Sequence, residues 1–185
     1  MQRKSFSRMV CPIARSLERV GEWWRILILR DALHGLTRFD QFQKSLGIAP
    51  NMLARRLNAL VDAGLLQRRR YSERPPRDEY VLTACGRDFR PVLVALLAWG
   101  NKHFAPEGPS VQLVNAKTGA AVDPILVDPA TRRPIQEPEY AFVPGPAASE
   151  GVRHRYASIG RPARSPAPHS RPAGEKDRTR KRSAR

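Results

Sequence analysis

The sequence contains few of the features that mark secreted or membrane-spanning chains. Its two cysteines, Cys11 and Cys85, are too few for a disulfide framework, so we expect a reducing, cytoplasmic compartment. The longest uncharged stretch around an apolar run, residues 91–101, is too short to cross a bilayer. The first ten residues include basic side chains but no apolar segment of signal-peptide length. These absences predict an intracellular protein without a membrane partner.

Constellations of catalytic or metal-binding residues are also missing. The four histidines are scattered, and there is no Gly-rich phosphate loop, no elbow-type serine motif and no pair of carboxylates in an apolar setting. No Cys-x-x-Cys pair or His-rich spacing indicates a metal site. His34, beside Gly35, fits a helix end, where it would stabilise the negative pole of the dipole. We therefore expect no enzyme activity, no metal and no cofactor.

Basic residues are abundant, and they are grouped. The chain of 185 residues has a net charge of +16. Residues 1–104 carry 19 Lys and Arg against 9 Asp and Glu, residues 105–150 carry 3 against 6, and residues 151–185 carry 11 against 2. Two separate basic blocks indicate a polyanionic partner. Double-stranded DNA is favoured over a membrane surface because neither block includes an amphipathic helix with an aromatic edge.

Two short helical patterns meet between residues 39 and 64, which predicts a helix-turn-helix. The first has Thr37 as its expected N-cap. Its apolar stripe consists of Phe39, Phe42 and Leu46. The second begins at Pro50 and ends near Gly64. Its apolar stripe consists of Leu53, Leu57, Leu60 and Val61.

The opposite face of this second helix is polar and has the chemistry of a DNA-recognition helix. It consists of Asn51, Met52, Arg55, Asn58 and Ala59, with Arg56 at its flank. Asn and Arg side chains can pair bidentately with adenine and guanine edges in the major groove. The alternative is a polar face that only contacts solvent, which most helices of this composition have.

A β-hairpin follows, and a hairpin after a recognition helix is the wing of a winged helix. Its expected strands, residues 65–71 and 79–82, flank a tip in which both Pro75 and Pro76 are expected, because proline donates no ladder hydrogen bond. The hairpin carries Arg68, Arg69, Arg70, Arg74 and Arg77. Guanidinium groups suit phosphates and the minor groove. The alternative is a solvated surface hairpin.

The residues expected to contact DNA come from the second helix of the helix-turn-helix and from the hairpin. They are Pro50, Asn51, Met52, Arg55, Arg56, Asn58, Arg68, Arg70, Arg74 and Arg77.

Three further helices are expected around this unit. The first spans residues 13–20. The second, residues 23–33, is apolar around most of its circumference, which indicates a central buried helix, and it is too long for a buried strand. The third is long, capped by Thr83 and kinked at Pro91. Its apolar stripe consists of Phe89, Val92, Leu93, Leu96, Leu97, Trp99 and Phe104.

The apolar stripe of this third helix either folds back on the domain or pairs with a second subunit. A small domain has too little surface to cover the stripe alone. We therefore expect a homodimer that reads a pseudo-palindrome.

The order of these features resembles the HxlR-type winged-helix transcriptional regulators, relatives of the MarR-like proteins, across residues 11–104. The matching residues are Cys11-Pro12, Gly21, Trp24, Arg38-Phe39, Leu53, Arg56-Leu57, Leu60, Gly64-Leu65, Pro75-Pro76-Arg77, Glu79-Tyr80, Leu82-Thr83, Gly86 and Trp99-Gly100. Trp23 and Cys85 depart from the usual pattern of the family.

The resemblance implies a DNA-binding regulator, such as a repressor, of bacterial or archaeal type that is associated with the nucleoid. It also implies a homodimer formed by the terminal helices. In part of the family the N-terminal cysteine, here Cys11, senses oxidants or electrophiles; the alternative is a small packing residue.

The fold class predicted is therefore α+β, mainly α. It comprises a flexible arm (1–10), a winged helix-turn-helix with a long dimerisation helix (11–104), a small β appendage (109–147) and a disordered basic tail (148–185). The appendage is expected to contain strands at 111–114, 125–127 and 140–143, and it resembles C-terminal extensions of some relatives. The predicted function is sequence-specific regulation of transcription, and the alternative is non-specific nucleic-acid binding through the basic wing and tail.

Overall fold

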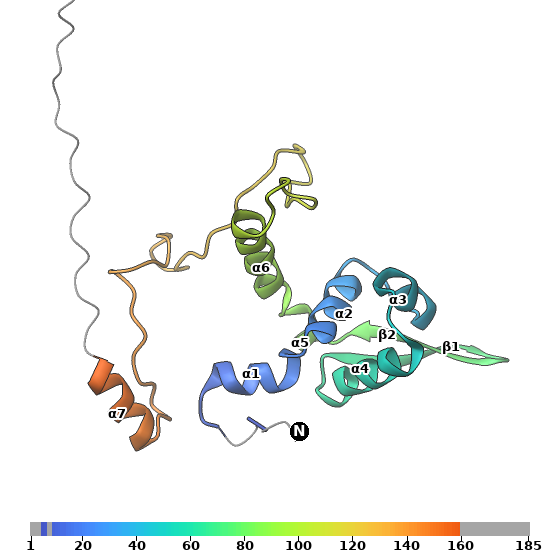
Figure 1. The fold of residues 1–185 in the computed structure, drawn as a ribbon, viewed down its shortest axis with the longest axis horizontal. Coiled ribbons are helices and arrows are strands. Elements are labelled where there is room, and N and C mark those ends of the chain that lie inside the picture. Colours follow the sequence, from blue (N-terminus) through green and yellow to red (C-terminus); the bar gives the residue numbers. More distant parts are fainter. Residues whose placement is uncertain (1–4, 7–8, 160–185) are drawn as a thin grey trace, which may run out of the picture.

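Helices form most of the fold, and one antiparallel hairpin projects from them (Figure 1). The computed structural model describes residues 5–6 and 9–159. The elements are α1 (Pro12–Val20), α2 (Trp23–Leu33), α3 (Phe39–Leu46), α4 (Pro50–Asp62), β1 (Leu66–Glu73), β2 (Pro76–Leu82), α5 (Ala84–Arg87), α6 (Arg90–His103) and α7 (Glu150–Ile159). The mainly α winged helix-turn-helix expected from the sequence is confirmed.

Helix α2 lies at the centre of the fold. Its Ile28 and Leu29 side chains have no exposed surface, and it contacts α1, α3, α4, α6 and β2. The opposing elements contribute Phe42 from α3, Leu53, Leu57 and Leu60 from α4, and Leu66 from β1. Each such side chain contributes about 1.5 to 3 kcal/mol by leaving water. The expectation that the second helix is the central, buried one is confirmed.

A left-handed glycine joins the two helices of the helix-turn-helix. Gly47 has φ of 61°, ends α3 and lets the buried Ile48 turn back into the core. Helix α3 begins one residue later than expected, because Arg38 rather than Thr37 is its N-cap. The reason is Gln41, whose Oε1 accepts from the backbone N–H groups of both Thr37 and Arg38, at 3.0 and 2.9 Å.

The hairpin is longer than the sequence indicates. Strands β1 and β2 continue to Glu73 and Pro76, which pair, so that only Arg74 and Pro75 remain in the turn. The expectation that both prolines lie in the tip is therefore wrong for Pro76, which starts a strand, where no ladder N–H is required of it. An irregularity between Arg70 and Ser72 leaves one extra residue in β1.

The expected long helix after the wing is two helices. Thr83 caps α5 as expected, with its Oγ1 accepting from Gly86 N at 3.1 Å and donating to Gly64 O at 2.6 Å. Gly86 packs so tightly that an added Cβ would lie 2.1 Å from Leu65 O. The chain then turns after α5, and Pro91 occupies the first turn of α6, where its missing N–H costs nothing. Pro91 thus starts a helix rather than kinking one.

Residues 109–147 form loops instead of the expected short strands. Each of two loops is closed by a single bridge, Val114 to Ala121 and Val127 to Pro134. The turns expected near 117–119 and 128–129 are present. Asn101 Nδ2 donates to Val111 O at 2.9 Å, which holds the first loop on α6. Two open cavities of about 390 and 290 Å³ lie between α6 and this segment.

The two ends of the chain are only partly described. In the expected flexible arm, Ser5 Oγ and Phe6 N donate to the carboxylate of Glu18 on α1, at 3.0 and 2.9 Å. Residues 150–159, expected to be disordered, form helix α7. Ser149 lies just before this helix and its Oγ accepts from Val152 N at 3.4 Å, as capping serines do. The rest of the predicted basic tail, residues 160–185, lies outside the described residues.

Candidate nucleic-acid interface

Helix α4 is anchored on one face and open on the other. Leu53 and Leu57 are fully buried against α2 and its neighbours, which fixes the rotation of the helix. The opposite face presents exposed Asn51, Arg55 and Asn58. Within the described residues, no hydrogen bond or ion pair occupies the side chains of Asn51 and Arg55. These two side chains are therefore available to a partner molecule.

Two residues expected on this face have structural contacts instead. Arg56 Nε lies 2.8 Å from Glu22 Oε2 in an ion pair that is mostly shielded from water, with 26% of the Arg56 and 14% of the Glu22 side chain exposed. The angles of this pair fall outside hydrogen-bond geometry. Met52 packs against the core and accepts a weak hydrogen bond from Arg56 Nη2 at 3.7 Å. Arg56 therefore ties α4 to the start of α2, because Glu22 is the N-cap of that helix.

Asn58 is connected to the wing. Its Oδ1 accepts a hydrogen bond from Arg68 Nη2 on β1, and the Arg68 guanidinium also lies 5.8 Å from the centre of the Tyr80 ring. The pair joins α4 to the hairpin across their solvent-facing sides. This bond uses one lone pair of the Asn58 oxygen and leaves its two amide hydrogens without a partner within the described residues. Arg68 is thereby directed toward α4 and away from the tip of the wing.

The arginines of the wing fall into two groups. In the middle of the hairpin, Arg69 Nε pairs with Glu79 at 2.7 Å and Arg70 Nε with Asp78 at 2.6 Å, each across the two strands. The hydrogen bond to Asp78 raises the pKa of Arg70 above its usual value. At the tip, the exposed side chains of Arg74 and Arg77 have no such partner within the described residues. Within the described residues, the arginine charge of the hairpin that no carboxylate pairs therefore lies at the tip, on Arg74 and Arg77, and at Arg68 beside α4.

The base of the wing is joined to the start of α3. Tyr80 N donates to Thr37 O at 2.7 Å, and Arg38 forms a β-bridge with Glu79. The Arg38 guanidinium lies 4.9 Å from the centre of the Tyr71 ring. Hydrogen bonds from Arg69 and then from the Thr37 side chain lower the pKa of Glu79. The helix-turn-helix and the wing are thus one connected unit.

Sequence reasoning missed three acidic side chains that organise this surface, Glu22, Asp78 and Glu79. Pairing the strands outward from the turn at Arg74 and Pro75 would have brought Glu79 opposite an arginine, but Asp78 opposite Tyr71. Asp78 meets Arg70 only because of the irregularity between Arg70 and Ser72, which the sequence does not signal. Glu22 had no such signal, since its partner lies 34 positions along the chain and only the packing of α2 on α4 brings them together.

The residues expected to form a dimer interface lie on another part of the molecule. Helix α6 buries none of its side chains completely. Phe89 packs on the core, Leu93 and Leu97 are half-buried, and the rest of the stripe, Val92, Leu96, Trp99 and Phe104, is exposed. The Trp99 and Phe104 rings meet edge to face, 4.8 Å apart. A protomer thus leaves an apolar stripe open along α6.

The two cysteines are separate. Cys11 is half-buried at the N-cap of α1, and Cys85 is exposed on α5. Arg15, four residues after Cys11 in the sequence, donates from its Nε to Met9 O at 2.6 Å. Among the residues that the structure describes, no group of three His, Cys, Asp or Glu side chains could hold a metal, and no helix is long and apolar enough to span a membrane.

Comparisons with known proteins agree with this geometry. Residues 19–108 match the family model described as HxlR-like helix-turn-helix. A helix-turn-helix-type transcriptional regulator of Mycobacterium tuberculosis is 44% identical over 116 residues, which are 62% of this chain and 73% of that protein. Two solved structures, both described as candidate transcription factors, are also similar. PA1374 of Pseudomonas aeruginosa is 60% identical, with a TM-score of 0.59 over 79% of this chain and 100% of that chain. PA1607 is 39% identical, with a TM-score of 0.68 over 76% and 99%. The resemblance noted in the sequence is confirmed.

The contacts of Arg56 generate a prediction about stability. We expect Arg56→Ala to lower the free energy of unfolding by about 1 to 3 kcal/mol, because it leaves the Glu22 carboxylate shielded from water without its cation. Chemical denaturation followed by circular dichroism measures the change. Arg55→Ala is the matched control, since Arg55 is exposed on the same helix, and its effect should stay within about 0.5 kcal/mol. Equal stabilities of the two variants would contradict a structural role for Arg56.

Proposed function

We propose that this chain, which belongs to the HxlR-like helix-turn-helix family and is a transcriptional regulator of that type, binds a pseudo-palindromic DNA operator as a homodimer. The observation that carries the proposal is the open face of α4, where Asn51 and Arg55 have no partner within the described residues while the helix itself is anchored by three buried leucines. A rigid helix with free Asn and Arg side chains suits base recognition in the major groove.

In this proposal the two parts of the surface have different tasks. Helix α4 enters the major groove, where Arg55 and Asn51 contact base edges. Asn58 contributes amide hydrogens and therefore contacts acceptors such as guanine O6 and N7 or thymine O4, because its oxygen is held by Arg68. The wing tip, with Arg74 and Arg77, contacts phosphates or the minor groove and so sets position rather than sequence.

Dimerisation through α6 would place two such units on one operator. The exposed stripe of Val92, Leu96 and Trp99 is the surface available for it. In a twofold dimer the recognition helices contact half-sites about 34 Å apart, one turn of DNA. A dimer bound where an operator overlaps a promoter excludes polymerase, so we propose repression as the mode of action, on the nucleoid in the cytoplasm.

Base recognition by α4 is tested by separating specific from random binding. An operator is first selected from a random duplex library with the unaltered protein. Arg55→Ala and Asn51→Ala should each weaken binding to this operator by about 1 to 3 kcal/mol and leave binding to random DNA nearly unchanged, since base contacts specify and phosphate contacts position. Titrations by fluorescence anisotropy measure both affinities. Arg90→Ala, an exposed arginine at the start of α6, is the control and should affect neither.

The same experiment distinguishes the proposed function from the alternative, non-specific nucleic-acid binding. A non-specific nucleic-acid binder, using its basic wing and tail, would enrich no sequence from the library, and its affinity would follow net charge alone. In that case Arg55→Ala and Arg90→Ala would weaken binding to every duplex by similar factors.

The role of α6 is tested by burying a charge in its stripe. Leu96→Asp should raise the dissociation constant of the dimer by at least about 100-fold, because an unpaired carboxylate would have to leave water. Sedimentation velocity measures the constant, and helical content by circular dichroism should be retained. Val114→Asp is the matched control, since Val114 on the first appendage loop is 46% exposed and Leu96 44%. A Leu96→Asp protein that dimerises as before would place the interface elsewhere.

We further propose that Cys11 responds to oxidants or electrophiles. The supporting observation is its half-exposed thiol at the N-cap of α1, beside the exposed apolar residues Ile13 and Leu17. Diamide with glutathione, which supplies the second thiol of a mixed disulfide while diamide is reduced to the hydrazine, should lower operator affinity of the unaltered protein and of Cys85→Ser, and it should leave Cys11→Ser unaffected. A loss of affinity in Cys11→Ser equal to that of the unaltered protein would assign the chemistry to Cys85.

A further inference from the structure

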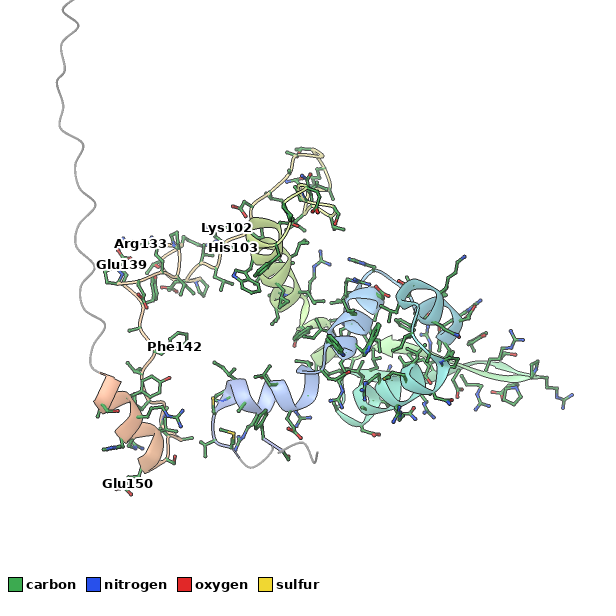
Figure 2. All side chains as sticks on the ribbon, in the orientation of Figure 1. Lys102, His103, Arg133, Glu139, Phe142 and Glu150 are labelled. Atoms are coloured by element: carbon green, nitrogen blue, oxygen red, sulfur yellow. The ribbon has the colours of Figure 1, made fainter. Side chains whose placement is uncertain are left out.

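One contact joins the face of α4 that is proposed to read bases with the wing. Arg68 Nη2 on β1 donates to Asn58 Oδ1 on α4, and the two elements contact each other. Figure 1 shows the hairpin leaving the helices beside α4, and Figure 2 shows side chains with nitrogen atoms, in blue, along the hairpin. The proposed function gives tasks to Asn58 and to the wing tip but none to Arg68. Arg68 is thus a wing residue whose partner is a proposed base-reading side chain.

The pairing of the strands turns Arg68 toward α4. Arg68 lies opposite Tyr80, and its neighbour Arg69 lies opposite Glu79. Successive side chains of a strand point to opposite faces, so Arg68 and Arg69 lie on different faces of the hairpin. The Tyr80 side chain is buried, and the Arg68 guanidinium lies 5.8 Å from the centre of its ring. Tyr80 N also donates to Thr37 O at 2.7 Å, so the ring beside Arg68 is fixed to the rest of the fold.

The carboxylate that could compete for Arg68 is already occupied. Asp78 lies two positions from Tyr80 on β2 and is therefore on the same face of the hairpin as Arg68. Its Oδ1 accepts from Arg70 Nε at 2.6 Å. In the described part of the chain, no carboxylate pairs with Arg68. Its Nη2 is thus left to the neutral oxygen of Asn58.

Arg68 fixes which end of the Asn58 amide points where. A guanidinium only donates hydrogen bonds, so Asn58 has to present its oxygen to Arg68. Turning the amide by half a rotation would place its NH₂ group against the guanidinium, donor against donor, and would lose a bond to a charged group. Without Arg68, either end of the amide could face a partner, because the oxygen and the NH₂ group are nearly the same size. The contact therefore selects one of two orientations.

Asn58 is the last of three polar side chains along the open face of α4. Asn51, Arg55 and Asn58 follow one another at i, i+4 and i+7. Three residues of a helix advance by about 4.5 Å, which is more than one base-pair step of about 3.4 Å. Asn58 therefore reaches another base pair than Arg55 does. In a DNA groove water leaves this surface, and the bond from Arg68 becomes stronger as the local dielectric constant falls.

We propose that Arg68 is a positioning residue that sets the base preference of Asn58. By holding the Asn58 oxygen, it turns the amide hydrogens toward the operator, so that Asn58 favours a base that presents acceptors, such as guanine O6 and N7 or thymine O4. Arg68 acts through Asn58 in this role, and its remaining donors are free for phosphates. This inference rests on the operator binding of the proposed function.

A double-mutant cycle on operator preference tests the coupling. The selected operator and a set carrying every single base-pair substitution are titrated with the unaltered full chain, Asn58→Ala, Arg68→Leu and the double variant. Preference at a position is the ratio of the affinities for the original and the substituted operator. We expect both single variants to lose preference at the same base pair, by about fivefold or more, and the double variant to lose no more than either. Preference at the other base pairs should remain.

This ratio separates positioning from a merely structural role. Damage to the wing, or loss of a phosphate contact, lowers affinity for every operator by the same factor, and that factor cancels in the ratio. Arg77→Leu is the matched control, since Arg77 is an exposed arginine on the other strand of the hairpin. It should weaken binding to all operators by similar factors and keep the preference at every position.

A second variant keeps a polar side chain at this position of β1. In Arg68→Gln the new amide can donate to Asn58 or accept from it, so it no longer selects one orientation of the Asn58 amide. The same preference should therefore be lost as in Arg68→Leu. Circular dichroism should show the same helical content in all variants, because the Asn58 and Arg68 side chains are exposed.

The possible results are distinguishable. A preference that survives in Arg68→Leu and Arg68→Gln, at the base pair that Asn58→Ala affects, would overturn the positioning role. Losses that add in the double variant, or that fall at different base pairs, would also overturn it, because the two residues would then act independently. If Asn58→Ala changes no preference, this inference fails while base recognition by Asn51 and Arg55 stands. A chain that enriches no operator from the random library would overturn the proposed function itself.

Discussion

The burial of α2 is the constraint on which the other elements depend. Ile28 and Leu29 have no exposed surface, and the helix contacts α1, α3, α4, α6 and β2 at once. Interiors packed to this degree do not deform continuously, so neighbouring helices shift together. The α4 face proposed for DNA and the α6 stripe proposed for a second copy both rest on α2. Both surfaces are therefore positioned by the same buried helix.

Apolar packing sets the rotation of each helix, and a few polar contacts set the angles between elements. Glu22 and Arg56 connect the start of α2 with α4, and the backbone bond from Tyr80 to Thr37 connects the wing with α3. These contacts are directional, unlike hydrophobic burial. The spacing between α4 and the wing tip thus depends on a small number of polar contacts, one between side chains and one between backbone groups.

Local patterns predicted much of this structure. Helices α1 to α4 and the hairpin were predicted from apolar spacing, such as that around Leu53 and Leu57, and from the prolines and glycines between the elements. Apolar spacing and turn residues are local signals, because each is encoded within a few residues. The open face of α4 followed from the same spacing. What local patterns could not predict depends on distant partners, as with Arg56 and Glu22. The loops of residues 109–147 looked like strands, because short apolar runs between turns have the same composition whether or not a neighbour pairs with them.

The paired arginines of the wing have a consequence for how the protein responds to salt. Asp78 and Glu79 serve Arg70 and Arg69 as built-in counterions. An arginine whose counterion is covalently part of the hairpin displaces few cations from the DNA atmosphere, because it brings little free charge to the phosphates. The wing therefore offers phosphates the charges of Arg68, Arg74 and Arg77, which no carboxylate pairs within the described residues, rather than those of five guanidinium groups. The charge is neutralised within the hairpin only in its middle, at Arg69 and Arg70.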